Sequence, residues 1–162
     1  MLFKKYKYNR AMDFSYIDVQ WPIVQANLIH IGIAFLLALP IGWNRERSGT
    51  ESAGLRTFPI VCIASCAFTL VGMQVFEGSD AEARVVYGVI TGMGFIGGGA
   101  ILKEGFHVAG TATAASIWNT GAIGVAVAYN KFEIAIVLSL INFVILQFAT
   151  PFKDPHKREG SD

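Results

Sequence analysis

The sequence predicts an all-α fold, a polytopic membrane helix bundle with about five transmembrane helices. Hydrophobic residues make up 53% of the 162 residues, and the mean hydropathy of +0.47 is high for a soluble domain. Charged residues are concentrated outside five windows that contain no Asp, Glu, Lys or Arg. At about 1.5 Å per residue, each window can cross the ~30 Å hydrocarbon core of a bilayer as a helix. The windows are Val19–Asn44, Thr57–Phe76, Val85–Leu102, Val108–Asn130 and Ile134–Phe152.

The windows are expected to be helices, because barrel strands alternate polar and apolar residues and none of the windows does. Aromatic residues, which favour the headgroup layer, lie at their ends, as Trp21, Trp43 and Tyr129 do. The first window follows basic residues as a signal peptide does, but it is longer than a signal h-region and is interpreted as a span. The expected helices are Pro22–Trp43, Phe58–Phe76, Val85–Leu102, Ala112–Tyr129 and Phe132–Ala149.

The chain is expected to comprise an N-terminal tail (1–18), a transmembrane domain (19–152) and a polar C-terminal tail (153–162). No room remains for a folded extramembrane domain. The Lys and Arg content of the two sides barely differs when the chain starts at Met1, but it favours one orientation clearly if translation starts at Met12. We therefore expect the N-terminus outside and the C-terminus in the cytoplasm, and both starts remain open.

Composition argues against two further classes of function. The net charge of +1 gives no general reason to expect nucleic-acid binding. Cys62 and Cys66 lie four positions apart on one helix face, where a disulfide is not expected and two sulfurs are too few for a closed zinc site. They are interpreted as small apolar packing residues.

The third window contains Gly92-Met93-Gly94-Phe95-Ile96-Gly97, which matches the dinucleotide-binding pattern G-x-G-x-x-G. No acidic residue follows about 20 positions further on, so a cofactor site is not expected. Small residues let membrane helices approach closely. We therefore expect this helix at the centre of the bundle, with Gly92 and Gly98 in tight contacts. Alternatively, Gly97–Gly99 unwinds and lines a polar cavity, as broken helices do in transporters.

A few polar residues interrupt the windows, notably His30, Asn119 and Asn142. Such groups usually hydrogen-bond across helices, so a structural role is expected. No acidic residue lies deep in any window, which argues against a proton relay or a dehydrated cation site. No nucleophile with a base and an orienting group emerges either. We expect no catalytic residue, no metal ligand and no cofactor, and we do not expect an enzyme.

The charged connections carry the remaining candidate residues. Arg45-Glu46-Arg47 and Ala53-Gly54-Leu55-Arg56-Thr57 lie in one expected cytoplasmic loop. Arg56 is expected either to pair with Glu46 or to present its charge to a partner. Asp80 and Arg84 are four apart near the start of the third helix, on the other side. Taken singly, these residues are explained as topology signals, snorkelling side chains and a surface ion pair. Taken together, the arginines could form a cytoplasmic docking site or anion site.

The order of these segments, followed by the glycine-rich stretch and by Gly110 to Trp118, resembles the MgtC/SapB family over roughly Trp21 to Ala149. The resemblance implies a bacterial inner-membrane protein with about five spans and a cytoplasmic C-terminus. It also implies a link to adaptation to low magnesium, to virulence in some bacteria and to control of a membrane ATPase. The candidate functional residues are Glu46, Arg47, Arg56, Thr57, Asp80, Arg84, Gly92, Gly94, Gly97, Gly98, Gly99, Thr113, Trp118 and Asn119.

Two departures from the family limit this resemblance. Better-known members carry a cytoplasmic C-terminal domain that binds small ligands, and this chain stops at Asp162 without one. In addition, Phe58 stands where many members have His, and Thr111-Ala112 occupies a segment where members tend to have a polar Asn or Thr. Functions of those family side chains are not carried over to this chain.

The preferred function is a non-enzymatic membrane regulator that acts on other membrane proteins, with a membrane ATPase as one partner implied by the resemblance. The lipid bilayer is its surroundings, and a homo-oligomer is an alternative. A second hypothesis is a small transporter or channel subunit for magnesium or another ion. A third, an intramembrane enzyme, lacks a catalytic set.

Overall fold

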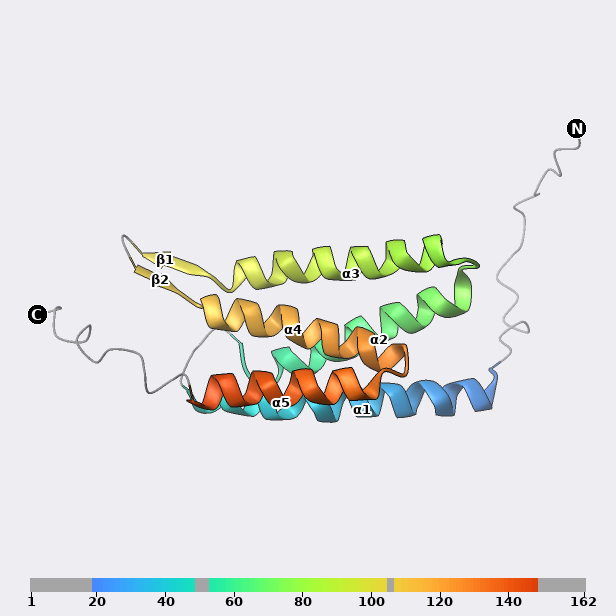
Figure 1. Ribbon diagram of the computed structural model, residues 1–162, viewed down its shortest axis with the longest axis horizontal. Coiled ribbons are helices and arrows are strands. Elements are labelled where there is room, and N and C mark those ends of the chain that lie inside the picture. Colours follow the sequence, from blue (N-terminus) through green and yellow to red (C-terminus); the bar gives the residue numbers. More distant parts are fainter. Residues whose placement is uncertain (1–18, 49–52, 105–106, 149–162) are drawn as a thin grey trace, which may run out of the picture.

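The computed structural model describes residues 19–48, 53–104 and 107–148, and these form a bundle of five helices with one short hairpin (Figure 1). The all-α fold class is therefore confirmed. The tails, including Met12, lie outside the described residues. The elements are α1 (Trp21–Arg47), α2 (Thr57–Val75), α3 (Ser79–Gly99), β1 (Leu102–Glu104), β2 (His107–Ala109), α4 (Thr111–Ala128) and α5 (Phe132–Phe148).

Large apolar side chains cover the outside of the bundle, while small and hydroxyl-bearing residues fill much of its inside. On α5, for example, Leu140 and Ile141 are exposed, whereas Ala135 and Ser139 are buried. Membrane helices pack through small residues because lipid is as apolar as their side chains. Within the described residues, α1 and α2 are long and apolar enough to span a membrane, and α5 is a shorter apolar helix. The protein is a membrane helix bundle.

Helix α4 occupies the centre of the bundle and contacts each of the other four helices. Two glycines permit this position. A Cβ atom at Gly124 would overlap the carbonyl oxygen of Cys62 on α2, and one at Gly121 would overlap the sulfur of Met93 on α3. Cys62 and Cys66 of α2 form no disulfide and are buried, as expected for small packing residues.

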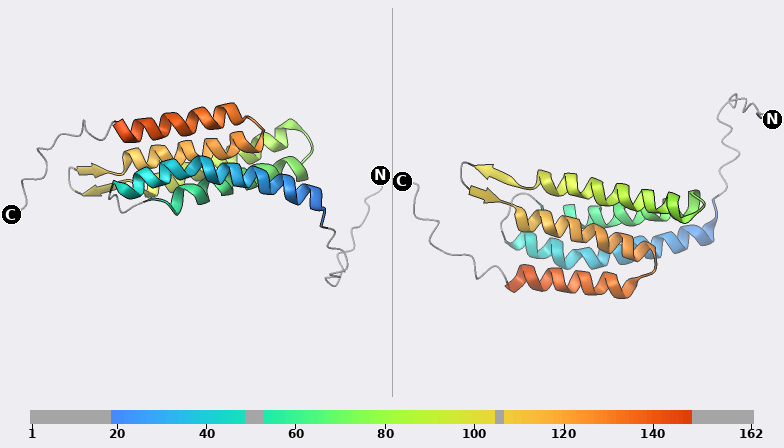
Figure 2. Two further views of the ribbon diagram at one scale, coloured as in Figure 1. Left: turned by 90° about the horizontal axis from the view of Figure 1, so that it is seen from below. Right: turned by 45° about the horizontal axis from the view of Figure 1, so that its top comes forward.

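Helix α3, in contrast, lies at the edge of the bundle, on the side away from α1 and α5 (Figures 1 and 2). Only Met93 and Gly97 are buried along its length. A Cβ atom added at Gly92 or Gly98 would meet no atom within 4 Å, so the expected tight contacts at these two glycines are wrong within this chain. The expectation that the third helix lies at the centre of the bundle is also wrong. Glycines on several faces of a helix allow other helices to approach closely, but they do not ensure that another helix packs there.

Several element boundaries differ from the sequence prediction. Helix α3 begins at Ser79, six residues before the charge-free window. The window marks the part of the chain that lies in lipid, and a helix can extend beyond it into the charged region. It continues as a helix through Gly99, so an unwound Gly97–Gly99 segment is not observed. Beyond it, β1 and β2 pair antiparallel, with Leu102 opposite Ala109, where a helix end and a plain loop were expected. This hairpin projects past the helices (Figure 2).

Candidate functional site at the hairpin end of the bundle

The end of the bundle beside the hairpin, called the hairpin end here, is where α1, α3 and α5 finish and α2 and α4 begin. Arg45, in the last turn of α1, is 9% exposed, and Thr113, near the start of α4, is fully buried. Arg45 Nη2 donates a hydrogen bond of 2.6 Å to Thr113 Oγ1. This contact places a guanidinium group between the first and fourth helices.

Glycine at position 110 allows α4 to start at this place. Gly110 has a φ of 84°, in the left-handed region that favours glycine. A side chain there would overlap the carbonyl oxygen of Ala100, just after the end of α3. The chain thus returns from the hairpin in close contact with α3 and directs Thr113 inward.

The segment Ala53–Thr57 is fastened to the end of α1 by Glu46. Glu46 Oε2 accepts a hydrogen bond of 2.9 Å from the Leu55 backbone N–H. A Cβ atom at Gly54 would overlap the same carboxylate, so a side chain at position 54 would force Glu46 to shift from this position. The expected partner Arg56 is exposed, and among the described residues no ion pair joins it to Glu46. The Glu46–Arg56 pairing is therefore replaced by a carboxylate-to-backbone contact.

Neutral polar groups continue inward from Arg45 and join three helices. Asn44 Nδ2 donates to Gln147 Oε1 at 2.7 Å, and Ser116 Oγ donates to Asn142 Oδ1 at 3.0 Å. Ser139 Oγ donates to the Leu37 carbonyl oxygen at 2.6 Å. The buried members of this group are called the polar interior here: Asn44, Arg45, Thr113, Ser116, Ser139 and Asn142. Within the described chain, Asn44 Oδ1 and Asn142 Nδ2 are buried without a hydrogen-bond partner.

Asn119 and His30 also form contacts between elements. Asn119 Nδ2 donates to the Leu138 carbonyl oxygen at 3.3 Å. His30 Nε2 lies 2.9 Å from Asn130 Oδ1, in the turn between α4 and α5, and His30 Nδ1 lies 2.7 Å from the Ala26 carbonyl oxygen. The structural role that the sequence predicts for His30, Asn119 and Asn142 agrees with these contacts.

The candidate residues do not form one site. Those gathered near the hairpin end are Glu46, Arg47, Arg56, Thr57, Gly97, Gly98, Gly99 and Thr113. Asp80 and Arg84 are exposed at the other end of α3, on the order of 25 Å away at 1.5 Å per residue. Gly92, Gly94, Trp118 and Asn119 lie between the two ends. Of the α3 glycines, Gly97 makes a close contact, 3.1 Å from the position of its added Cβ to the Ala114 carbonyl oxygen.

Sequence reasoning misses most of the polar interior. It groups Arg45 with the loop charges, although this residue directly follows the first charge-free window. Thr113, Ser116 and Thr120 repeat at three- and four-residue spacing on α4 and are all buried. That hydroxyl stripe, followed by Gly121 and Gly124, is the signal that could have identified α4 as the central helix.

Comparisons with known proteins identify the family to which this sequence is similar. The MgtC family matches residues 31–154. Protein SrpB of Synechococcus elongatus is 33% identical over 70% of this chain and 69% of its own length. Protein MgtC of Brucella abortus is 40% identical over 57% of this chain and 38% of its own length. "Putative magnesium transporter YhiD" of Escherichia coli is 33% identical over 74% of this chain and 59% of its own length.

These matches cover most of the described helices, although the chain spans only part of the length of several relatives. No solved structure gives a significant match. The matched region begins in the middle of α1 and includes Arg45, the Ala53–Thr57 segment, the glycine-rich α3 and all of α4 and α5. The chain belongs to the MgtC family of membrane proteins.

Proposed function

We propose that this protein is a non-enzymatic regulator in the bacterial inner membrane, which supports growth in scarce magnesium by acting on other membrane proteins. Family membership and the name of the YhiD relative connect the chain with magnesium. The N-terminus is proposed to lie outside and the C-terminus in the cytoplasm, which puts the hairpin end on the cytoplasmic side. A tag-accessibility assay tests this orientation, and a C-terminus found outside would contradict it.

The observation that favours a regulator over a magnesium channel is the position of Arg45. Among the described residues, the buried polar side chains are neutral except for this arginine. A guanidinium group carries only hydrogen-bond donors and cannot ligate a cation. Mg²⁺ also gives up its hydration water reluctantly and is usually met by carboxylate oxygens. The polar interior offers hydroxyl and amide groups around a guanidinium, which is a poor environment for a divalent cation.

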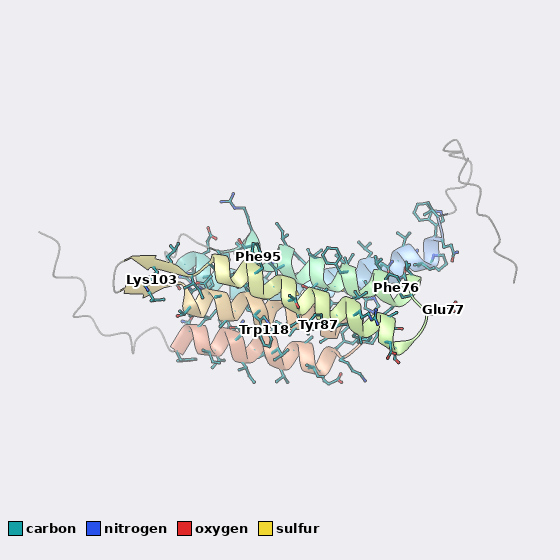
Figure 3. All side chains as sticks on the ribbon, turned by 90° about the horizontal axis from the view of Figure 1, so that it is seen from above. Phe76, Glu77, Tyr87, Phe95, Lys103 and Trp118 are labelled. Atoms are coloured by element: carbon teal, nitrogen blue, oxygen red, sulfur yellow. The ribbon has the colours of Figure 1, made fainter. Side chains whose placement is uncertain are left out.

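The outer face of α3 is the surface proposed to meet a partner. Phe95 is 87% exposed on this face (Figure 3), and Gly94 and Gly98 on either side of it leave open space. A photo-crosslinking residue at Phe95 in native membranes should capture a specific protein, whereas the same residue at Ile145 on α5 serves as a matched, exposed control. Equal capture from both positions would argue against α3 as the partner surface.

Two measurements separate regulation from transport. A strain without the protein should grow poorly in limiting magnesium and recover when the gene is restored. Purified protein in liposomes should show no protein-dependent magnesium uptake. Uptake that the Arg45→Gln variant increases would favour the alternative, a transporter or channel subunit for magnesium or another ion.

A further inference from the structure

Two apolar grooves run along the flanks of α3, one of about 440 Å³ against α2 and one of about 410 Å³ against α4 and α5. The second, called the α3–α5 groove here, has a feature that the first lacks: a charged residue at one end. Its apolar walls include Ile90 of α3, Trp118 of α4 and Leu138 of α5, and it ends at Tyr129 and Lys131. Figure 3 looks onto this face and shows Trp118 beside α3.

Both signs of charge are present at that end, which we call the mouth. Lys131 is exposed in the turn between α4 and α5, and Glu82, in the first turn of α3, lies near Tyr129. The turn itself is fixed by Asn130, which has a left-handed φ of 57° and contacts His30. A carboxylate and a lysine thus lie near one tyrosine at the mouth.

The length of the groove is suited to one acyl chain of a lipid. From Tyr129 to Trp118 the groove follows α4 for about 16 Å at 1.5 Å per residue, close to half of the ~30 Å hydrocarbon core. A groove of this length accommodates one acyl chain of a single leaflet.

We propose that the α3–α5 groove binds one acyl chain of a phospholipid whose headgroup carries a phosphate and a primary ammonium, such as phosphatidylethanolamine. Lys131 contacts the phosphate, and Glu82 accepts hydrogen bonds from the ammonium. Phosphatidylcholine lacks ammonium N–H donors, and phosphatidylglycerol lacks the cation, so neither satisfies both groups. Lysine near a helix end can reach the headgroup layer while its stem remains on apolar surface.

The test uses the full chain in mixed vesicles of equal parts phosphatidylethanolamine, phosphatidylglycerol and phosphatidylcholine. Native mass spectrometry after gentle extraction counts the retained lipids of each class. Phosphatidylethanolamine should be retained above both others. Lys131→Gln should lower the retention of phosphatidylethanolamine by roughly fivefold. One lysine near a headgroup contributes about 1 kcal/mol, and a tenfold change in affinity corresponds to about 1.4 kcal/mol. Lys103→Gln, an exposed lysine on the distant hairpin, is the matched control and should change nothing.

Two further variants separate the headgroup from the chain. Glu82→Gln should abolish the preference for phosphatidylethanolamine over phosphatidylcholine without lowering the total lipid retained. Ala122→Leu, which adds volume inside the groove, should lower retention of all three classes while the melting temperature confirms folding. Preference for phosphatidylglycerol, equal retention by every variant, or a dimer that Ala122→Leu dissociates would overturn the proposal. Because lipid retention is measured without reference to magnesium, its failure leaves the regulator proposal unaffected.

Discussion

Arg45 Nη2 and Thr113 Oγ1 lie 2.6 Å apart and join the last turn of α1 to the first turn of α4. Both side chains are buried, at a level where the bundle meets its charged connections. Glu46, the next residue on α1, holds Leu55 just before α2 begins. Adjacent residues of one helix thus connect α1 to two other helices, which gives the Arg45-Glu46 dipeptide a structural role beyond that of a topology signal.

Thr113→Val tests the first of these links. The substitution keeps the shape of the side chain but removes the oxygen that accepts from a charged donor. We expect the free energy of unfolding to fall by about 1–3 kcal/mol, the typical cost of a buried group that loses its partner. Thermal unfolding in detergent measures the change. Thr111→Val, in the same turn but exposed, is the control, and equal melting of both variants would contradict the prediction.

Gly124→Ala tests the central position of α4. The added methyl group would overlap the Cys62 carbonyl oxygen, so we expect destabilisation of about 1–3 kcal/mol from overpacking. Gly94→Ala on α3 meets open space and should keep or raise stability by up to about 1 kcal/mol, because alanine favours helix over glycine. The same melting measurement applies to both. Reversed effects would mean that α3 has a neighbour here and α4 does not.

Arg56→Lys separates the charge of this residue from its shape. Arg56 is exposed, and the loop is held by Glu46 without it, so stability should change by less than about 0.5 kcal/mol. Lysine retains the positive charge needed for orientation but loses the planar guanidinium. We expect normal insertion and impaired growth in limiting magnesium. Full rescue by the lysine variant would show that only the charge matters.

A double-mutant cycle measures the bond between Ser116 and Asn142. Polar pairs between membrane helices contribute about 0.6 kcal/mol on average. We expect Ser116→Ala and Asn142→Leu to show a coupling free energy of about that size, because the two side chains lie 3.0 Å apart. The coupling free energy is obtained by measuring the unfolding of four proteins in mixed micelles: the parent, both single variants and the double variant. Strict additivity would indicate that the contact contributes nothing to stability.

The sequence alone was sufficient to predict the fold class and the number of helices. The segregation of charged and apolar residues along the chain depends on whether a segment lies in lipid or in water, and it does not depend on which helices pack against each other. It also predicted that Asn119 and Asn142 bond across helices, since lipid offers no alternative partner. The hairpin between α3 and α4 could not be predicted from the same pattern. Its strands are only three residues long and lie where the apolar window gives way to Lys103.

Tertiary structure decided which helix is central and which side chains are buried. Glycines at Gly92 and Gly124 are equivalent in sequence terms, yet one meets open space and the other meets the α2 backbone. A small residue makes close approach of another helix sterically possible. Whether a helix packs there depends on the positions of all five helices. In the same way, the sequence placed Arg45 at a helix end, but only the start of α4 directly after Gly110 brought Thr113 within hydrogen-bonding distance of it.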